Sequence, residues 1–281
     1  MKRVKLMALV ALFGFSFVAC TTEDSVGTDA SVEATTIDEA QASNLSDLVI
    51  STADDYIYEF ENNGYKVSNG MQKVGANTPT DTVIITVDKT GLTVFPKKIC
   101  VDFGSGFTDK RGNILKGKLY LTISNKMTIV GSTKKVEFSN FFINDNQLKG
   151  SKTITFNGIK DLNPSWSISV KDTVVRKDGT KVIWNSDRVR TRITNATLLI
   201  AADDTISITG SSNGVNAKNI PFTMTITKPL VLVPGYKFFV SGSVVTATEN
   251  RNVLLDYGNG EKDAKATITY NEVTKVIDLK K

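Results

Sequence analysis

Apolar and polar residues alternate along most of the chain after residue 64, and alternation with a period of two is the pattern of half-buried β-strands. Runs rich in Thr, Val, Ile and Phe, such as DTVIITV, KGKLYLTIS and GSKTITF, recur at short and fairly even intervals. Turn signals such as KDGT, SSNG and DYGNG separate these runs, with no helical pattern between them. The sequence therefore predicts an all-β fold for residues 65–281, an antiparallel meander that forms a sandwich, a half-barrel or a long curved sheet, in one unit or in two related halves.

Residues 46–64 follow a different period, that of one short amphipathic helix. Apolar side chains recur at helical spacing between Val49 and Phe60. Ser46 or Asn44 can cap the start of this helix, and Gly64 is placed to end it. We expect the helix to lie against the β-rich body and to cover one end or edge of it.

Residues 1–19 have the pattern of a secretory signal peptide. Basic residues at positions 2, 3 and 5 precede an uncharged run, 6–18, which is shorter than the ~20 apolar residues that span a bilayer. Ala19 stands directly before Cys20. This arrangement resembles the lipobox of bacterial lipoproteins, which implies cleavage before Cys20, a thioether-linked diacylglyceryl group on its sulfur, and acyl chains such as palmitate in the membrane. An ordinary signal peptide cleaved nearby is the alternative.

Residues 20–45 contain acids, no base and few large apolar side chains, so we interpret most of this segment as a solvated tether behind the lipidated cysteine. Its six acids are Glu23, Asp24, Asp29, Glu33, Asp38 and Glu39. Acids directly behind such a cysteine resemble the export signal of Bacteroidota lipoproteins, which implies the outer face of the outer membrane. A generic acidic linker that faces the periplasm is the alternative.

The composition excludes several kinds of chemistry. The chain has no histidine, which rules out Ser-His-Asp and Cys-His catalysis and His-based metal sites. Besides Cys20 the chain has one other cysteine, Cys100, so no internal disulfide can form; we interpret Cys100 as a buried thiol that acts as a small apolar group. Calcium bound by oxygen ligands, paired carboxylates and lysine chemistry stay open. No catalytic motif is recognisable, so we do not expect an enzyme.

The formal charge is +5 for the whole chain, +2 after removal of residues 1–19, and +8 for the body without the six tether acids. A basic body can attract anionic glycans or lipid headgroups. The lysines can equally keep a β-rich surface soluble and its edges unpaired. Nucleic acid is not an expected partner, because the chain is exported and carries no nucleic-acid-binding motif.

Two segments echo each other without gaps, DTVIITVDKTGLTVFPKKICVDFGSGFTD and GYKFFVSGSVVTATENRNVLLDYGNGEKD. Each ends in a glycine motif flanked by two aspartates, Asp102 and Asp109 in the first segment and Asp256 and Asp263 in the second. These carboxylates are candidate calcium ligands, although two per loop is few for an ion that takes six to eight oxygens. We favour a hairpin loop in which each Asp accepts hydrogen bonds from backbone amides. A carboxylate pair of the glycosidase type is a further alternative.

The run VIWNSDRVRTRI is the second candidate site. Alternation places Trp184, Arg188, Arg190 and Arg192 on one face of a strand. An indole beside three guanidinium groups can form a platform for a glycan or an anionic ligand. The alternative, which we favour, is a solvated strand face whose arginines pair with acids on neighbouring strands.

Several stretches, among them VDFGSGFTDKRGNILKGKLYLTI, FFINDNQLKGSKTITF and LLDYGNGEKDAKATIT, resemble a family of uncharacterised Bacteroidota lipoproteins of the outer membrane and cell surface. The similarity extends over most of the body. It implies an envelope location and a β-rich fold, and it carries over no activity, cofactor or catalytic residue.

The sequence thus predicts a lipid-anchored protein of the outer membrane, at the cell surface or on the periplasmic face. We expect a non-enzymatic role in binding or scaffolding, with a glycan or another envelope protein as partner and no cofactor beyond the lipid on Cys20. A carrier of hydrophobic cargo is one alternative and predicts a large cavity lined by Phe, Ile and Val. A polysaccharide-acting enzyme with paired carboxylates is the other, and it predicts two acids facing each other across an open cleft.

Overall fold

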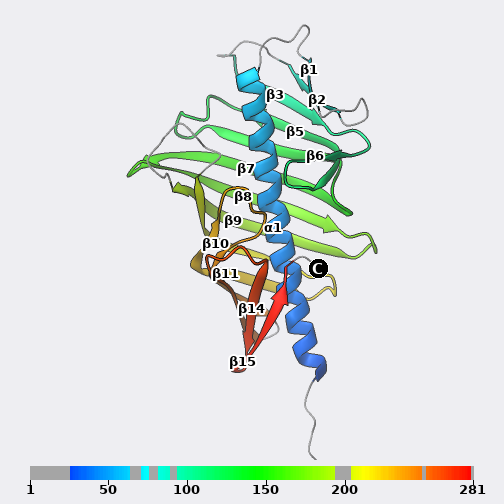
Figure 1. Ribbon diagram of the computed structural model, residues 1–281, viewed down its shortest axis with the longest axis vertical. Helices are drawn as coiled ribbons and strands as arrows, with labels where there is room; N and C mark the ends of the chain where they lie inside the picture. Colours follow the sequence, from blue (N-terminus) through cyan, green and yellow to red (C-terminus); the bar gives the residue numbers. More distant parts are fainter. Residues whose placement is uncertain are drawn as a thin grey trace, which may run out of the picture.

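The protein is seen in a computed structural model that describes residues 26–63, 71–75, 82–88, 94–193, 204–248 and 251–279. Cys20 and the signal segment 1–19 therefore lie outside the described residues. The described strands form one sheet in the order β1-β2-β3-β5 and then consecutively to β15, with the short β4 pairing beside β5. Every neighbouring pair is antiparallel. The predicted all-β antiparallel meander is confirmed, and it takes the form of one long open sheet rather than a sandwich (Figure 1).

The strands differ in length, and the longest lie in the middle of the sheet. The first seven are β1 (Met71–Gly75), β2 (Thr82–Val87), β3 (Lys97–Asp102), β4 (Phe107–Thr108), β5 (Ile114–Ile123), β6 (Thr133–Ile143) and β7 (Asn146–Lys160). The others are β8 (Asn163–Val175), β9 (Lys181–Ile193), β10 (Thr205–Val215), β11 (Pro221–Leu232), β12 (Ser241–Thr248), β13 (Arg251–Asn259), β14 (Lys265–Tyr270) and β15 (Val273–Asp278).

One helix, α1 (Val26–Asn63), runs across these strands on one side of the sheet (Figure 1). At 1.5 Å per residue its 38 residues extend over about 57 Å. It ends directly before Gly64, as predicted, but it begins about 20 residues earlier than the expected start at Asn44 or Ser46. It also crosses the face of the sheet instead of covering one end. The expectation of a solvated tether is therefore wrong for residues 33–45, which are helical and buried or partly buried.

The longer helix has a physical explanation in its small and acidic side chains. Residues such as Thr35, Ala40 and Ser43 are buried, because short side chains let the helix lie close to the sheet. The helix carries nine acidic residues and no basic one, whereas the rest of the body is rich in lysine and arginine. Its acids pair along its length with bases of the sheet and its loops; the pairs are Glu33–Lys275, Asp38–Arg176, Glu39–Arg188, Asp54–Lys134 and Asp55–Lys110/Arg111.

Alternation along the strands sorts side chains between an inner face, which contacts α1, and a solvent-exposed outer face. On β8, for example, Ile168, Val170 and Val174 are buried on the inner face, while Ser167 and Ser169 are exposed on the outer face. The inner face and α1 enclose two apolar clusters, one mainly under the strands before β10 and one under β10 and the strands that follow it. No helix among the described residues is both long and apolar enough to cross a membrane.

The echoed segments correspond only in part. Their second strands align, since β3 and the first six residues of β13 occupy equivalent positions before the two glycine motifs. Their first strands do not, because β12 begins at the position equivalent to the last residue of β2. The echo therefore holds for one strand and its glycine turn, and not for a whole hairpin.

Candidate functional site

The predicted Trp–Arg face of β9 lies beneath α1. Alternation was predicted correctly, because Val182, Trp184, Ser186 and Arg188 are buried while the residues between them are more exposed. Trp184 is 1% exposed and Arg188 is 5% exposed. Neither side chain is available to stack on a glycan or to bind an external anion. The expectation of an accessible platform is wrong, because the helix covers the face that the pattern assigned to a ligand or to solvent.

Arg188 is the centre of a buried polar group between the helix and the sheet. Its guanidinium donates a hydrogen bond of 2.6 Å to Ser43 Oγ, and it lies 3.4 Å from Glu39 Oε1 and 3.5 Å from Asp47 Oδ2. Glu39, Ser43 and Asp47 are spaced four residues apart, so they lie on one side of α1. The Arg188 guanidinium carbon also lies 4.8 Å from the centre of the Trp184 ring, a cation–π contact.

A second buried ion pair lies next to this group. Lys152 on β7 contacts Asp172 on β8, and both side chains are almost completely buried. Lys152 Nζ also donates a hydrogen bond of 2.7 Å to Ser46 Oγ on α1. The helix is thus joined to β7 and β9 by charged hydrogen bonds in the interior, where leaving one member unpaired costs several kcal/mol. We call Glu39, Ser43, Ser46, Asp47, Lys152, Asp172 and Arg188 the helix–sheet ionic cluster.

Burial dominates the protonation behaviour of this cluster. It raises the pKa of Glu39 and of Asp47, and the charge of Arg188 opposes both shifts. Burial also lowers the pKa of Lys152 and raises the pKa of Asp172, while the attraction between the two opposes these shifts. Each group therefore depends on its partners for its charged form, which makes the cluster sensitive to the loss of any one member.

The other two predicted arginines have different partners. Arg190 donates a hydrogen bond of 3.3 Å to Ser51 Oγ on α1. Arg192 Nε lies 3.0 Å from Asp204 Oδ2, just before β10. The favoured interpretation was a solvated face whose arginines pair with acids on neighbouring strands, and the pairing of Arg192 with Asp204 comes closest to it. For Arg188, however, the acids come from the helix and not from a neighbouring strand.

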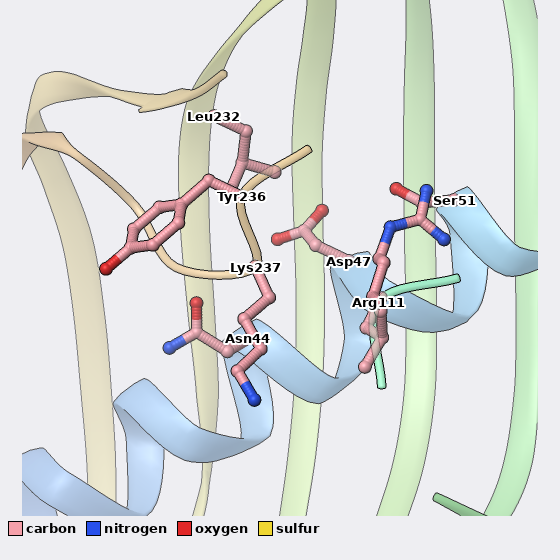
Figure 2. Close-up of a pocket in the computed structure, with 8 residues that line it drawn as sticks. Asn44, Asp47, Ser51, Arg111, Leu232, Tyr236 and Lys237 are labelled. Carbon is pink, nitrogen blue, oxygen red and sulfur yellow. The ribbon is translucent and has the colours of Figure 1, made fainter. Parts of the chain in front are cut away.

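A small cavity lies beside the helix–sheet ionic cluster (Figure 2). Its lining residues are Asn44, Asp47, Leu48, Ser51, Arg111, Leu232, Tyr236 and Lys237. Figure 2 shows the Asp47 carboxylate between Tyr236 on one side and the Arg111 guanidinium on the other. The cavity volume of about 30 Å³ has room for roughly two water molecules. This space can hydrate the edge of the cluster, and it is too small for a sugar or a lipid.

A larger cavity of about 180 Å³ lies over β13, β14 and β15. It includes the second glycine motif, with Asp256, Glu261 and Asp263 in its lining. Neither of these two cavities has the lining of Phe, Ile and Val that a carrier of hydrophobic cargo requires.

The aspartates of both glycine motifs bind their own loops. Asp102 Oδ1 accepts a hydrogen bond of 2.9 Å from Gly104 N, and Asp256 Oδ1 accepts one of 2.8 Å from Gly258 N. The later aspartates do the same, since Asp109 accepts from the amides of residues 111 and 113, and Asp263 from that of residue 265. No group of three or more acidic or cysteine side chains suited to a metal occurs within the described part of the chain. The geometry matches the favoured interpretation of turn-stabilising aspartates.

Cys100 lies on β3 and is partly buried. Burial raises the pKa of its thiol. This environment fits a packing role and not that of a nucleophile, which needs a lowered pKa.

Sequence reasoning missed Glu39, Asp47, Lys152 and Asp172. A signal for two of them was present, because Lys152 and Asp172 stand at inward positions of otherwise apolar alternation on β7 and β8. Charged residues at such positions require buried partners of opposite charge. Lys152 and Asp172 are these partners for each other, whereas Glu39 could be assigned to Arg188 only once the helix was known to extend back past Glu39. Comparisons of the chain with protein-family models, with curated proteins and with solved structures gave no match.

Proposed function

We propose that this chain is a lipid-anchored protein of the bacterial outer membrane with a non-enzymatic role in binding or scaffolding. The sequence feature behind the anchor is Ala19–Cys20 at the end of the apolar run. The structural support is the position of α1, which begins six residues after Cys20 and is joined to the sheet by ion pairs from Glu33 to Asp55. Such a helix would couple the anchor firmly to the β body.

The surface that this arrangement leaves open is the outer face of the central strands. Four hydroxyl side chains and one carboxylate stand in register across it, in the row Thr153, Ser169, Asp187, Ser211 and Thr225. Neighbouring strands lie about 4.8 Å apart, so the row offers closely spaced hydrogen-bonding groups. A glycan or the polar surface of another envelope protein fits this chemistry, and we place the binding role here instead of on the buried Trp184 face.

The burial of the helix–sheet ionic cluster supports binding over catalysis. Its ionisable groups are packed between α1 and the inner face, and the adjoining cavity has room only for about two water molecules. A substrate could reach them only if the helix moved away. The cluster is therefore better suited to holding the helix in place than to reacting with a ligand.

Two experiments test the proposal. Mass spectrometry of the mature protein should find a diacylglyceryl group on an N-terminal Cys20, and Cys20→Ser should shift the protein from the membrane to the soluble envelope fraction. An unmodified terminus would contradict the anchor. For the binding role, a photo-crosslinking amino acid at Ser169, on the outer face, should capture a partner on intact cells, whereas the same residue at Lys218, in the loop before β11, should not. Equal capture at both positions would count against the outer face.

A further inference from the structure

The first turns of α1 and the hairpin formed by β14 and β15 point in the same direction (Figure 1). The hairpin turn, Asn271–Glu272, lies at the tip of this projection. Lys275 Nζ on β15 lies 2.8 Å from Glu33 Oε1 on α1, which fixes the hairpin to the beginning of the helix. We propose that the tip of this hairpin is the surface with which the protein contacts the phospholipid headgroups of the membrane that holds its anchor. The inference rests on the lipidation of Cys20 proposed above.

Chain length limits how far the hairpin can lie from the membrane. Six Cα–Cα steps separate Cys20 from Val26, and a fully extended chain covers at most about 3.6 Å per step, or about 20 Å in total. The beginning of α1 therefore stays within about 20 Å of the anchored residue. Asp55, 29 residues further along α1, lies about 44 Å away along the helix axis. Only the end of the sheet that carries β14 and β15 is close enough to touch the membrane when the helix stands upright.

The side chains at the tip suit a membrane interface. Val273 is 70% exposed, more than any other large hydrophobic residue in the described part of the chain, and Val276 on the same strand is 59% exposed. Tyr270, the cross-strand partner of Val273, is partly exposed, and Tyr and Lys side chains can keep a polar end in the headgroups while their apolar parts are covered. Lys275 is already paired with Glu33, so the contact we infer is apolar and does not require anionic lipid.

A second exposed apolar group makes the orientation testable. It comprises Ile129, Val130, Ile159 and Leu162, in the loop before β6 and at the turn between β7 and β8. This group lies at the ends of the central strands and not at the end where α1 begins. If the body instead lay on its side against the membrane, these residues would make the contact and the β14–β15 tip would not.

The test uses full-length lipidated protein with Cys100→Ala, reconstituted into phosphatidylcholine vesicles. Single cysteines replace Val273 at the tip, Leu162 at the lateral group or Ile114 near the far end of α1, and each is labelled with an environment-sensitive fluorophore. Brominated phosphatidylcholine should quench the label at position 273 at least about threefold more than the labels at 162 and 114, because a contact reaches only ~5–10 Å into the interface.

Stronger quenching at position 162 or 114 than at 273 would overturn the inferred orientation, as would equal quenching at all three positions. Failure of the anchor is detected separately. If the unlabelled protein does not float with the vesicles and Cys20 carries no lipid by mass spectrometry, the proposed anchor is wrong and the orientation is wrong with it. Flotation with lipidated Cys20 but without quenching at position 273 contradicts the orientation alone.

Discussion

Removal of one charge from the Lys152–Asp172 pair is the most informative test of the helix–sheet ionic cluster. In Lys152→Met an unbranched apolar side chain of similar length replaces the ammonium, and Asp172 stays behind in a site that is 3% exposed. Ser46 on α1 also loses the hydrogen bond that Lys152 donates. We expect the variant to be strongly destabilised, because the Asp172 carboxylate must then remain unpaired or take up a proton.

The expected magnitude follows from the burial of both partners. Breaking a buried ion pair by removing one member costs about 3–5 kcal/mol, whereas replacing both members with well-packed apolar residues is often neutral. The total stability of a folded domain is only about 5–15 kcal/mol, so the single variant should lose a large part of it. Lys152→Met combined with Asp172→Leu should recover most of that loss, since no unpaired charge remains.

The assay is equilibrium urea unfolding of the wild type, both single variants and the double variant, followed by tryptophan fluorescence. Trp184 lies beneath α1 and reports on the contact between helix and sheet. With a urea dependence of about 3 kcal/mol per molar for a chain of this size, the single variants should shift the midpoint by roughly 1–1.7 M. A loss below about 1 kcal/mol in Lys152→Met, the range typical of surface pairs, would refute the buried pairing.

Three further predictions concern other parts of the molecule. Burial raises the pKa of Glu39 in the folded protein, so Glu39 binds a proton more tightly when the chain is folded. This preference stabilises the folded state fully at pH values below the pKa of Glu39 in the unfolded chain, about 4.3. The stabilisation is lost as the pH rises through the pKa of Glu39 in the folded protein. Glu39→Gln should therefore show less loss of stability between pH 4 and 8 than the wild type in urea titrations, and an identical pH profile would contradict this. Gly117→Ala should cost about 1–3 kcal/mol more than Gly112→Ala, because both glycines have positive φ but a Cβ at position 117 would lie 1.9 Å from the carbonyl oxygen of Asn140; equal melting temperatures would show that the strand can shift. Cys100 should react with a disulfide reagent more slowly in the folded than in the urea-unfolded protein at pH 8, because burial raises the pKa of its thiol, and equal rates would show that the thiol is accessible.

The sheet could be predicted because its signals are local. Each strand shows its own alternation, and the turn signal KDGT marks the hairpin between β8 and β9. The turn predicted at SSNG is wrong, because these residues lie inside β10 and the chain turns directly after it. The faces of β9 followed from the same rule, which placed Trp184 and Arg188 together. A single open sheet could not be chosen over a sandwich, because that choice depends on pairing between strands and not on the pattern within each one.

The helix and the site could not be predicted in full because their signals are long-range. Residues 26–45 lack the large apolar side chains that usually bury a helix, and their acids are stabilised by bases as distant in sequence as Arg188 and Lys275. When those partners are not known, the composition of these residues is that of a solvated segment. Assigning the acids to a tether also hid the charge complementarity between an acidic helix and a basic sheet.

Hydrogen–deuterium exchange of the segment 33–45 tests the central claim most directly. This segment is helical and is fixed to the sheet by Glu39, Ser43 and their partners. An isolated helix as short as the segment 33–45 has only marginal stability in water, so the amides of this segment would be protected from exchange only through contact with the sheet. We predict that these amides exchange about as slowly as those of β7–β9. Exchange at the rate of a free peptide, while the strands stay protected, would contradict the account.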